Sequence, residues 1–419
     1  MSLIERILPP FARSARESLE ALTTRGEEVA PESLGLAPDS VESLWRKVEE
    51  IYNSGEHPAI QFCIRREGSV VMNRAIGQLS GGHSEPESVD PDDVIGLETP
   101  INLFSASKAV TAMVIHKLDE ENALRLDDRV ADHIPGFDRH GKGDITVRHV
   151  LGHRAGLPTM PPEVLNLDLL GQPERIVEIL CDARLESEPG GKLAYHAVTG
   201  GFILAEVARS ATGLTLRELL RDKIAEPLGL SCFNYGVDPR EVDEVAVNSA
   251  TGFPLVPPLT GILRRALSTD LTSLVKLSND PRFLTGIIPS ANVISTAYEV
   301  ALFYQCLLDQ GAHQGEAIFD ARTVRQAIEP QTGWELDFTL MAPVPYSLGF
   351  MLGSRSLGLF GYDNPLAFGH VGLSNVFTWA DPERDLVVAL LTTGKPILGT
   401  HLVPLLSLLG EIGQCFPKR

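Results

Sequence analysis

Apolar side chains follow two patterns along the chain, one with a period of about two residues near both ends and one with a helical period in the middle. Short apolar runs of the first kind, rich in Val, Ile, Leu and aromatic residues, are typical of β-strands. They occupy residues 60–66, 70–77, 347–352, 375–380 and 386–393. The first two flank a turn at Gly68, and the last two flank a turn at Pro382. Each of these pairs predicts a β-hairpin.

The second pattern places apolar positions at a spacing close to that of an α-helix. It predicts helices over residues 41–51, 172–185, 199–211, 216–228, 296–310 and 399–412. Gly213, Gly229 and Gly311 follow three of these stretches, at the place where a glycine ends a helix. Residues 80–93 and 236–290 are rich in Gly, Ser, Pro or Asp, which predicts irregular loops, and we expect the second stretch to face substrate.

The order of the two patterns indicates an α+β fold, in which one antiparallel sheet is built from the N- and C-terminal segments and flanked by helices. Residues 1–40 are predicted as a helical N-terminal extension. Residues 41–118 and 286–419 are predicted to form the domain that contains the sheet. The fold prediction includes an inserted all-helical lobe, to which residues 119–285 are assigned as a mainly helical segment with substrate-facing loops.

The charge balance and the cysteines restrict the classes of partner. The 419 residues include 55 acidic and 36 basic side chains, a formal net charge of −19, so we expect no nucleic-acid partner. The five cysteines contain no CxxC pair, which favours neither a zinc ribbon nor a disulfide framework. No apolar stretch reaches the roughly 20 residues that span a bilayer, and charges interrupt residues 1–8. We therefore expect a cytoplasmic protein without a membrane span.

Ser105 and Lys108 open a mostly apolar stretch that is typical of a buried helix. Residues three apart on a helix point to the same side, and a lysine among apolar residues is costly unless it has a partner or a task. A desolvated amine loses its proton more readily and can activate a serine hydroxyl as a nucleophile. The alternative is that Ser105 or Ser107 caps the helix and Lys108 is solvated.

Two further stretches carry groups that would complete such a site. Tyr195 lies in a glycine-flanked turn, where a nearby cationic Lys108 would lower the phenol pKa and let a phenolate take the serine proton. Packing of the ring with its hydroxyl in water is the alternative. His370 and Gly372 open a late strand, and the glycine lets the backbone approach a ligand closely. A backbone N–H there and that of Ser105 would form an oxyanion hole.

His149 and His153 are four residues apart, a spacing that suits two ligands of one metal ion on a helix face. The neighbouring sequence has no glutamate placed as in a zinc protease and no evident third ligand. We therefore expect capping or hydrogen-bonded core histidines, and we assign no metal site.

The candidate groups follow one another as Ser105 and Lys108, then Tyr195, then His370 and Gly372. In this order and rough spacing the chain resembles the serine β-lactamase and penicillin-binding-protein superfamily. The resemblance is greatest to its class C-like branch, which includes the family VIII carboxylesterases. It covers roughly residues 40–410, with further similar stretches at 145–157, 226–230 and 369–391.

The resemblance implies a role for each of these residues. Ser105 would be the acylated nucleophile, Lys108 a proton relay, and Tyr195 the general base that later protonates the leaving group. The backbone N–H groups of Ser105 and Leu373 would form the oxyanion hole. A water activated by Tyr195 would resolve the acyl-enzyme, and we expect no cofactor.

Two substrate-binding positions depart from the pattern of the lactamases and peptidases. Where those proteins end the tyrosine motif with Asn or Ser, this chain has Ala197, which lacks the amide that grips the acylamino group of a β-lactam. The late-strand motif usually begins with Lys, whereas here it begins with His370, which is mostly neutral near neutral pH. Both changes weaken recognition of an anionic β-lactam or peptide, and they favour neutral esters.

The leading prediction is therefore a serine carboxylesterase that acts on small or short-acyl esters through an acyl-enzyme on Ser105. Acyl transfer to an alcohol or amine, and weak β-lactam or amide hydrolysis, are alternatives on the same site. A non-catalytic binding relative is a further alternative, although an idle scaffold has no chemical need for Lys108. The sequence assigns no oligomeric state.

Overall fold

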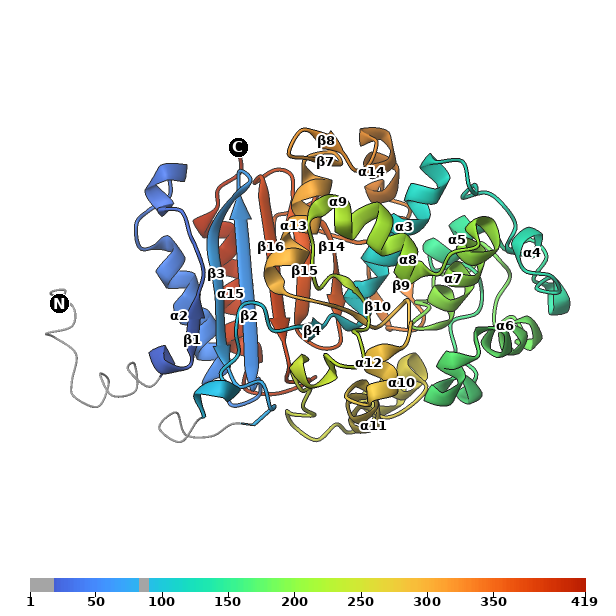
Figure 1. Cartoon of the computed structure of the whole chain (residues 1–419), viewed down its shortest axis with the longest axis horizontal. Helices are drawn as coiled ribbons and strands as arrows, with labels where there is room; N and C mark the ends of the chain where they lie inside the picture. Colours follow the sequence, from blue (N-terminus) through green and yellow to red (C-terminus); the bar gives the residue numbers. More distant parts are fainter. Residues whose placement is uncertain (1–18, 83–89) are drawn as a thin grey trace, which may run out of the picture.

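A seven-stranded antiparallel sheet forms the centre of the computed structural model, which describes residues 19–82 and 90–419 (Figure 1). Its strands are β1 (Thr23–Arg25), β2 (Ala59–Arg66), β3 (Ser69–Gly77), β11 (Met351–Leu352), β14 (Phe368–Gly372), β15 (Val376–Asp381) and β16 (Leu386–Thr392). They follow the order β1-β3-β2-β16-β15-β14-β11. The two ends of the chain meet at the central pair, where Ile64 of β2 lies opposite Val388 of β16. The expected α+β fold and both predicted hairpins are confirmed.

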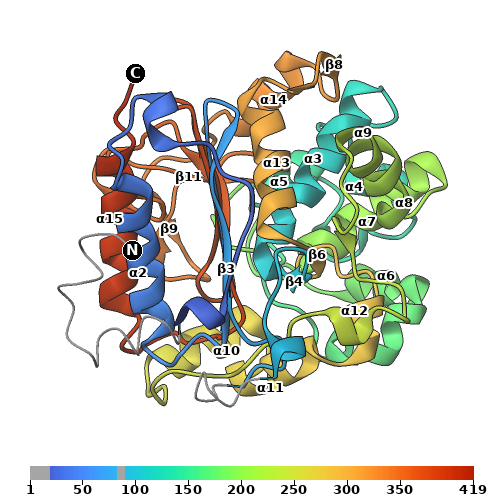
Figure 2. The ribbon, with the colours of Figure 1, turned by 60° about the vertical axis from the view of Figure 1, so that its left-hand side comes forward.

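Helices cover both faces of the sheet, so every residue of β2 and of β16 is buried. On one face, α2 (Ser40–Tyr52) and α15 (Leu402–Cys415) share a core with Ile60 and Ile64. On the other face, α13 (Ala297–Leu308) packs against β2, β15 and β16. Figure 2 shows the sheet between these two layers. Burial on both faces explains why the two strands are continuous apolar runs rather than strict alternations.

Helix α3 (Ser107–Glu120) lies between the sheet and a group of helices from residues 119–285. These helices are α4 (Val130–His133), α5 (Val147–Leu151), α6 (Pro173–Asp182), α7 (Thr199–Thr212), α8 (Leu216–Leu220), α9 (Glu226–Leu228), α10 (Leu259–Leu267), α11 (Leu271–Ser278) and α12 (Pro281–Thr285). Helix α7 ends at Gly213 with a φ of 77°, the left-handed C-cap that the sequence predicts.

A small three-stranded sheet connects the segment before α3 to this group of helices. Strand β6 (Val293–Ser295) pairs with β4 (Ile101–Asn102) on one side and with β5 (Asn234–Tyr235) on the other. Because β5 belongs to residues 119–285, that segment is not purely helical, in contrast to the prediction. Strands of two or three residues pair across long sequence separations and leave little periodic signal.

Two further predictions are wrong in their details. In the segment predicted as a helical extension, residues 1–18 lie outside the described residues, and Thr23–Arg25 form the edge strand β1 beside β3. The pairing is long-range, so local periodicity does not reveal it. The segment 236–290, predicted as irregular, contains α10, α11 and α12. Asp270 and Asp280 cap the last two of these, which are too short to show a clear helical period. Of the predicted loop 80–93, residues 83–89 lie outside the described residues.

The remaining elements are short and lie mainly between α13 and β14. They are β7 (Ala312–His313), β8 (Glu316–Ala317), α14 (Ala321–Ile328), β9 (Leu336–Asp337), β10 (Ala342–Pro343), β12 (Leu357–Gly358) and β13 (Gly361–Tyr362). Among the residues that the structure describes, no helix has both the length and the apolar character that a membrane crossing requires.

Candidate active site

The candidate nucleophile, Ser105, lies in a short turn between β4 and α3. The turn is a 3-10 helix, Phe104–Ala106, and Phe104 has a left-handed φ of 47°. Such a φ is uncommon for an aromatic residue, and strained backbone of this kind concentrates at functional sites. Helix α3 is buried almost all around, because it lies between the sheet and the neighbouring helices. The turn thus presents Ser105 at the N-terminal end of a rigid central helix.

Lys108 is buried on the first turn of α3, and its Nζ contacts three uncharged oxygen atoms. The Nζ atom lies 3.3 Å from Ser105 Oγ, 2.7 Å from the carbonyl oxygen of Ala197 and 3.1 Å from that of Ser290. Burial lowers the pKa of Lys108 to about 7. Near neutral pH a large fraction of the amine is therefore unprotonated and able to accept the hydroxyl proton of Ser105.

Tyr195 lies beside both of these side chains. Its hydroxyl shares a hydrogen bond with Ser105, and Lys108 Nζ lies 4.7 Å from its ring centroid. Burial raises the pKa of the Tyr195 phenol, and the hydrogen bond with Ser105 opposes this shift. The net direction is opposite to the lowered phenol pKa that the sequence predicts, because burial has the larger effect. In the resting site the amine is therefore the better proton acceptor, and the neutral phenol is a proton donor.

Strand β14, which carries His370 and Gly372, packs against the turn Phe104–Ala106 that holds Ser105. A Cβ atom at Gly372 would lie 2.2 Å from the carbonyl oxygen of Leu103, so this close approach requires glycine. Leu373 follows directly, in the turn between β14 and β15. The two predicted oxyanion donors, Ser105 and Leu373, thus belong to segments that pack against each other although they are distant in sequence.

His370 and Ala197 lie next to the reactive groups and carry no charge. His370 is buried, its Nδ1 lies 2.9 Å from the carbonyl oxygen of Val371, and its ring centroid lies 6.2 Å from that of Tyr195. Burial, and then the neighbouring Lys108, lower the pKa of His370 to about 3, so the imidazole is neutral near neutral pH. Ala197 contributes its carbonyl oxygen to the site, and its methyl side chain forms no hydrogen bond. Neither side chain offers a positive charge to an anionic substrate.

Several buried residues lie behind Tyr195, and only His153 among them is a candidate from the sequence. Asp337 accepts a hydrogen bond from the Tyr195 backbone N–H at 3.1 Å and another from the Tyr346 hydroxyl at 3.1 Å. The ring of His153 packs 4.8 Å from that of Tyr195 and 5.1 Å from that of Tyr346, between centroids. Ser290, whose carbonyl holds the site lysine, lies in the stretch predicted as irregular. These residues share no local motif, so only the fold brings them together.

The two histidines considered as metal ligands have structural surroundings. His149 Nδ1 accepts the backbone N–H of Thr146 at 3.2 Å and completes a capping box at the start of α5. His153 is buried, and burial holds its pKa well below the usual range. The prediction of capping and core histidines is confirmed. Within residues 19–82 and 90–419, no group of three His, Cys, Asp or Glu side chains is arranged to hold a metal ion.

A family model described as Beta-lactamase matches residues 44–402, which is most of the chain. The chain belongs to the beta-lactamase family. The matched range contains the nucleophile turn, all of residues 119–285 and strands β2 to β16 of the central sheet. Membership places this beta-lactamase family protein among serine hydrolases of the same fold, and it confirms the resemblance seen in the sequence.

Similar members of the family differ in the activity that their names state. Esterase/beta-lactamase LipL of Mycobacterium tuberculosis is 28% identical over 308 residues, which cover 69% of this chain and 68% of LipL. A protein of Escherichia coli K12, named as a proposed D-alanyl-D-alanine carboxypeptidase, is 24% identical over 88% of this chain and 85% of its own length. The crystal structure of a family VIII carboxylesterase has a TM-score of 0.75 and 26% identity, covering 91% of this chain and 99% of that one.

Proposed function

We propose that this chain is a serine carboxylesterase that cleaves small, neutral, short-acyl esters through an acyl-enzyme on Ser105. One observation carries the proposal: Lys108 Nζ lies 3.3 Å from Ser105 Oγ, and burial lowers the pKa of this amine to about 7. A buried amine with uncharged partners is costly for the fold. Beside a serine hydroxyl it has a chemical use, since it accepts the proton that makes the hydroxyl nucleophilic.

In the acylation step, Ser105 Oγ attacks the ester carbonyl while its proton passes to the neutral amine of Lys108. The carbonyl π electrons move onto oxygen, and the backbone N–H groups of Ser105 and Leu373 stabilise this oxyanion. When the tetrahedral intermediate collapses, the bond to the alcohol oxygen breaks and Tyr195 donates its proton to that oxygen. The ammonium of Lys108 then returns a proton to Tyr195. The alcohol leaves, and the acyl group stays on Ser105.

Deacylation repeats these steps with water in place of the alcohol. The water gives a proton to the Tyr195 oxygen while the Tyr195 proton passes to the neutral amine of Lys108, and the water oxygen attacks the acyl carbon. The bond to Ser105 Oγ breaks, the serine recovers a proton, and the carboxylic acid leaves. The raised pKa of Tyr195 and the lowered pKa of Lys108 suit this division of work, because the amine holds the proton in transit and the phenol delivers it.

The preference for neutral esters is supported by the two departures from the lactamase pattern. His370 is uncharged, and Ala197 offers only a methyl group where an amide would grip an acylamino substituent. An anionic β-lactam or peptide therefore loses both a charge partner and a hydrogen-bond partner. Esterase activity stands in the name of LipL, beside beta-lactamase, and in that of the family VIII carboxylesterase, which supports an ester as the substrate.

The test compares p-nitrophenyl acetate, butyrate and a longer ester with a chromogenic cephalosporin. We expect turnover of the short esters, weak turnover of the cephalosporin, and loss of both in Ser105→Ala. Ser107→Ala is the matched control, because Ser107 is a buried serine two residues away whose Oγ accepts the Val293 N–H at 2.9 Å. This variant removes a serine hydroxyl from the first residue of α3, next to the turn that holds Ser105, and should keep the activity.

Three outcomes would contradict the proposal. Ester turnover that survives in Ser105→Ala excludes this residue as nucleophile, and turnover abolished by a chelator points to a metal hydrolase. Cephalosporin turnover faster than that of the esters identifies a β-lactamase instead.

Mass spectrometry of the protein after an acid quench, which traps the acyl group, locates the ester bond on the peptide with Ser105. Added alcohols distinguish hydrolysis from acyl transfer, because transfer yields a new ester rather than the acid.

A further inference from the structure

The end of strand β16 carries two buried polar side chains that the catalytic scheme does not use. Thr392 is the last residue of the strand, and Lys395 follows three positions later; both are fully buried. A buried lysine far from solvent needs a reason, as Lys108 does. The surroundings of this pair point to the two backbone segments that carry the oxyanion donors.

Lys395 contacts the turn Phe104–Ala106, which holds Ser105. Its Nζ donates to the carbonyl oxygen of Thr392 and lies 4.7 Å from the ring centroid of Phe104, the residue before Ser105. Phe104 holds the left-handed φ of 47° that orients the turn. Burial lowers the pKa of Lys395 to about 7, and either its ammonium or its neutral amine can point N–H groups at an aromatic face, so the ring of Phe104 has a polar partner. The contact holds a strained residue in place, which strained backbone requires.

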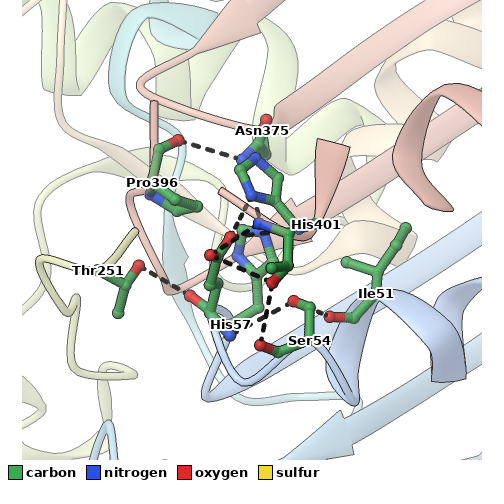
Figure 3. A network of polar contacts seen from close by, with 9 residues as sticks. Ile51, Ser54, His57, Thr251, Asn375, Pro396 and His401 are labelled. Carbon is green, nitrogen blue, oxygen red and sulfur yellow. Dashed lines mark hydrogen bonds and ion pairs between the residues drawn. The ribbon is translucent and has the colours of Figure 1, made fainter. Parts of the chain in front are cut away.

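Thr392 contacts the turn of residues 373–375, which holds the other donor, Leu373. Its Oγ1 donates to the carbonyl oxygen of Asn375 at 3.1 Å. Asn375 has a φ of 62° and closes the turn that begins with Leu373. The Asn375 side chain is held from the same side, since its Nδ2 lies 3.4 Å from the carbonyl oxygen of Pro396 and 3.5 Å from His57 Nε2. Figure 3 shows this side chain at the edge of a buried polar network.

The segment between these contacts is itself held on both sides. The Thr393 backbone N–H donates to the carbonyl oxygen of Ala59 at 3.0 Å, and that of Lys395 donates to Ser249 at 2.8 Å. A Cβ atom at Gly394 would lie 1.8 Å from the carbonyl oxygen of Glu56, so the backbone there packs against its neighbour without room for a side chain. Residues 392–395 are therefore a rigid support rather than a free loop.

We propose that Thr392 and Lys395 are positioning residues that hold the backbone donors of Ser105 and Leu373 at the spacing an oxyanion requires. This role rests on the proposed function. The two donors come from distant parts of the chain, and each lies near a non-glycine residue with left-handed φ. One short segment contacts both strained turns, so it sets their relative position. Preorganised donors need no rearrangement during the reaction, and small displacements of such groups reduce the rate.

The test uses Lys395→Met and Thr392→Val, which keep the volume and remove the polar atoms. Lys142→Met is the matched control. Lys142 is also fully buried, donates to the carbonyl oxygens of Arg139, Cys181 and Ala183, and lies near an aromatic ring, but it is on the loop before α5. The measurements are the single-turnover acylation rate with p-nitrophenyl butyrate, ester binding before acylation, and inhibition by a phenylboronic acid, whose tetrahedral adduct fills the oxyanion hole.

We expect both variants to lower the acylation rate about tenfold or more and to weaken boronate inhibition by a similar factor, with ester binding unchanged within about twofold. Thr392→Ser, which restores the hydroxyl, should recover most of the rate. Lys142→Met should lower the thermal midpoint without these losses. If Lys395→Met does not fold, the comparison of Thr392→Val with Thr392→Ser decides.

If Lys395→Met and Thr392→Val show the same acylation rate and boronate inhibition as Lys142→Met, the positioning role is overturned. So would equal losses in ester binding and acylation, because they indicate a general distortion of the site. A wild-type protein that is not acylated on Ser105 would instead refute the proposed function. The two failures are therefore distinguishable.

Discussion

The pKa of the site lysine makes the pH dependence of kcat/KM a quantitative test of the catalytic scheme. In the proposed scheme only the neutral amine of Lys108 accepts the serine proton, so we expect kcat/KM to follow the unprotonated fraction of this group in the free enzyme. Burial lowers the pKa of Lys108 to about 7. The neutral fraction therefore grows as the pH rises through that value. The expected profile loses activity on the acid side and reaches a plateau on the alkaline side.

The size of the effect follows from a single titrating group. The neutral fraction is about 0.9 one pH unit above the pKa and about 0.1 one unit below it, so kcat/KM falls about tenfold for each further unit. A solvated lysine, with a pKa of about 10.4, would place the acid limb of the kcat/KM profile more than about three pH units higher. The nearby histidines do not produce this acid limb, because burial lowers the pKa of His370 to about 3 and that of His196 to about 4. Burial also lowers the pKa of Lys395 to about 7, and a limb that came from Lys395 would persist when Lys108 is replaced.

The assay follows p-nitrophenyl butyrate from about pH 5.5 to pH 9 at constant ionic strength, at a wavelength where nitrophenol and nitrophenolate absorb equally. Lys108→Arg is the informative variant, because a guanidinium keeps the charge and cannot act as a base. We expect its kcat/KM to fall by about 10³ and to lose the acid limb. A profile that is flat through neutral pH, or an acid limb that persists in Lys108→Arg, would refute the assignment of the base.

Three further outcomes are expected. Tyr195→Phe removes the hydroxyl bonded to Ser105 and should lower kcat by about 10² to 10⁴, checked by steady-state ester hydrolysis, while unchanged kcat would exclude the phenol as proton donor. His370→Lys places a cation beside the site and should raise cephalosporin turnover relative to ester turnover; a constant ratio contradicts the role given to charge at this position. Asp381→Asn breaks the buried ion pair in which Arg384 lies 2.8 Å from Asp381. We expect the free energy of unfolding, measured in urea, to fall by about 3 to 5 kcal/mol. A urea midpoint equal to that of the wild type would contradict this expectation.

The fold was predictable where burial is decided by neighbours close in sequence. The hairpin of β2 and β3 and the helix α7 follow from local periodicity and from the residues at their ends. The edge strand Thr23–Arg25 was not predictable, because a strand of three residues carries too few periodic positions. The same holds for the helices of residues 236–290, which are short and in part capped. The candidate site divides in the same way.

Local sequence was enough to name the candidate groups of the proposed chemistry. Ser105 and Lys108 share a helix turn, and an i, i+3 spacing is a local property that needs no knowledge of the rest of the chain. How these groups titrate depends on the tertiary structure. The pKa of Lys108 and that of Tyr195 shift in opposite directions because both groups are desolvated, and desolvation depends on segments such as Ala197 and Ser290 that the fold brings from elsewhere.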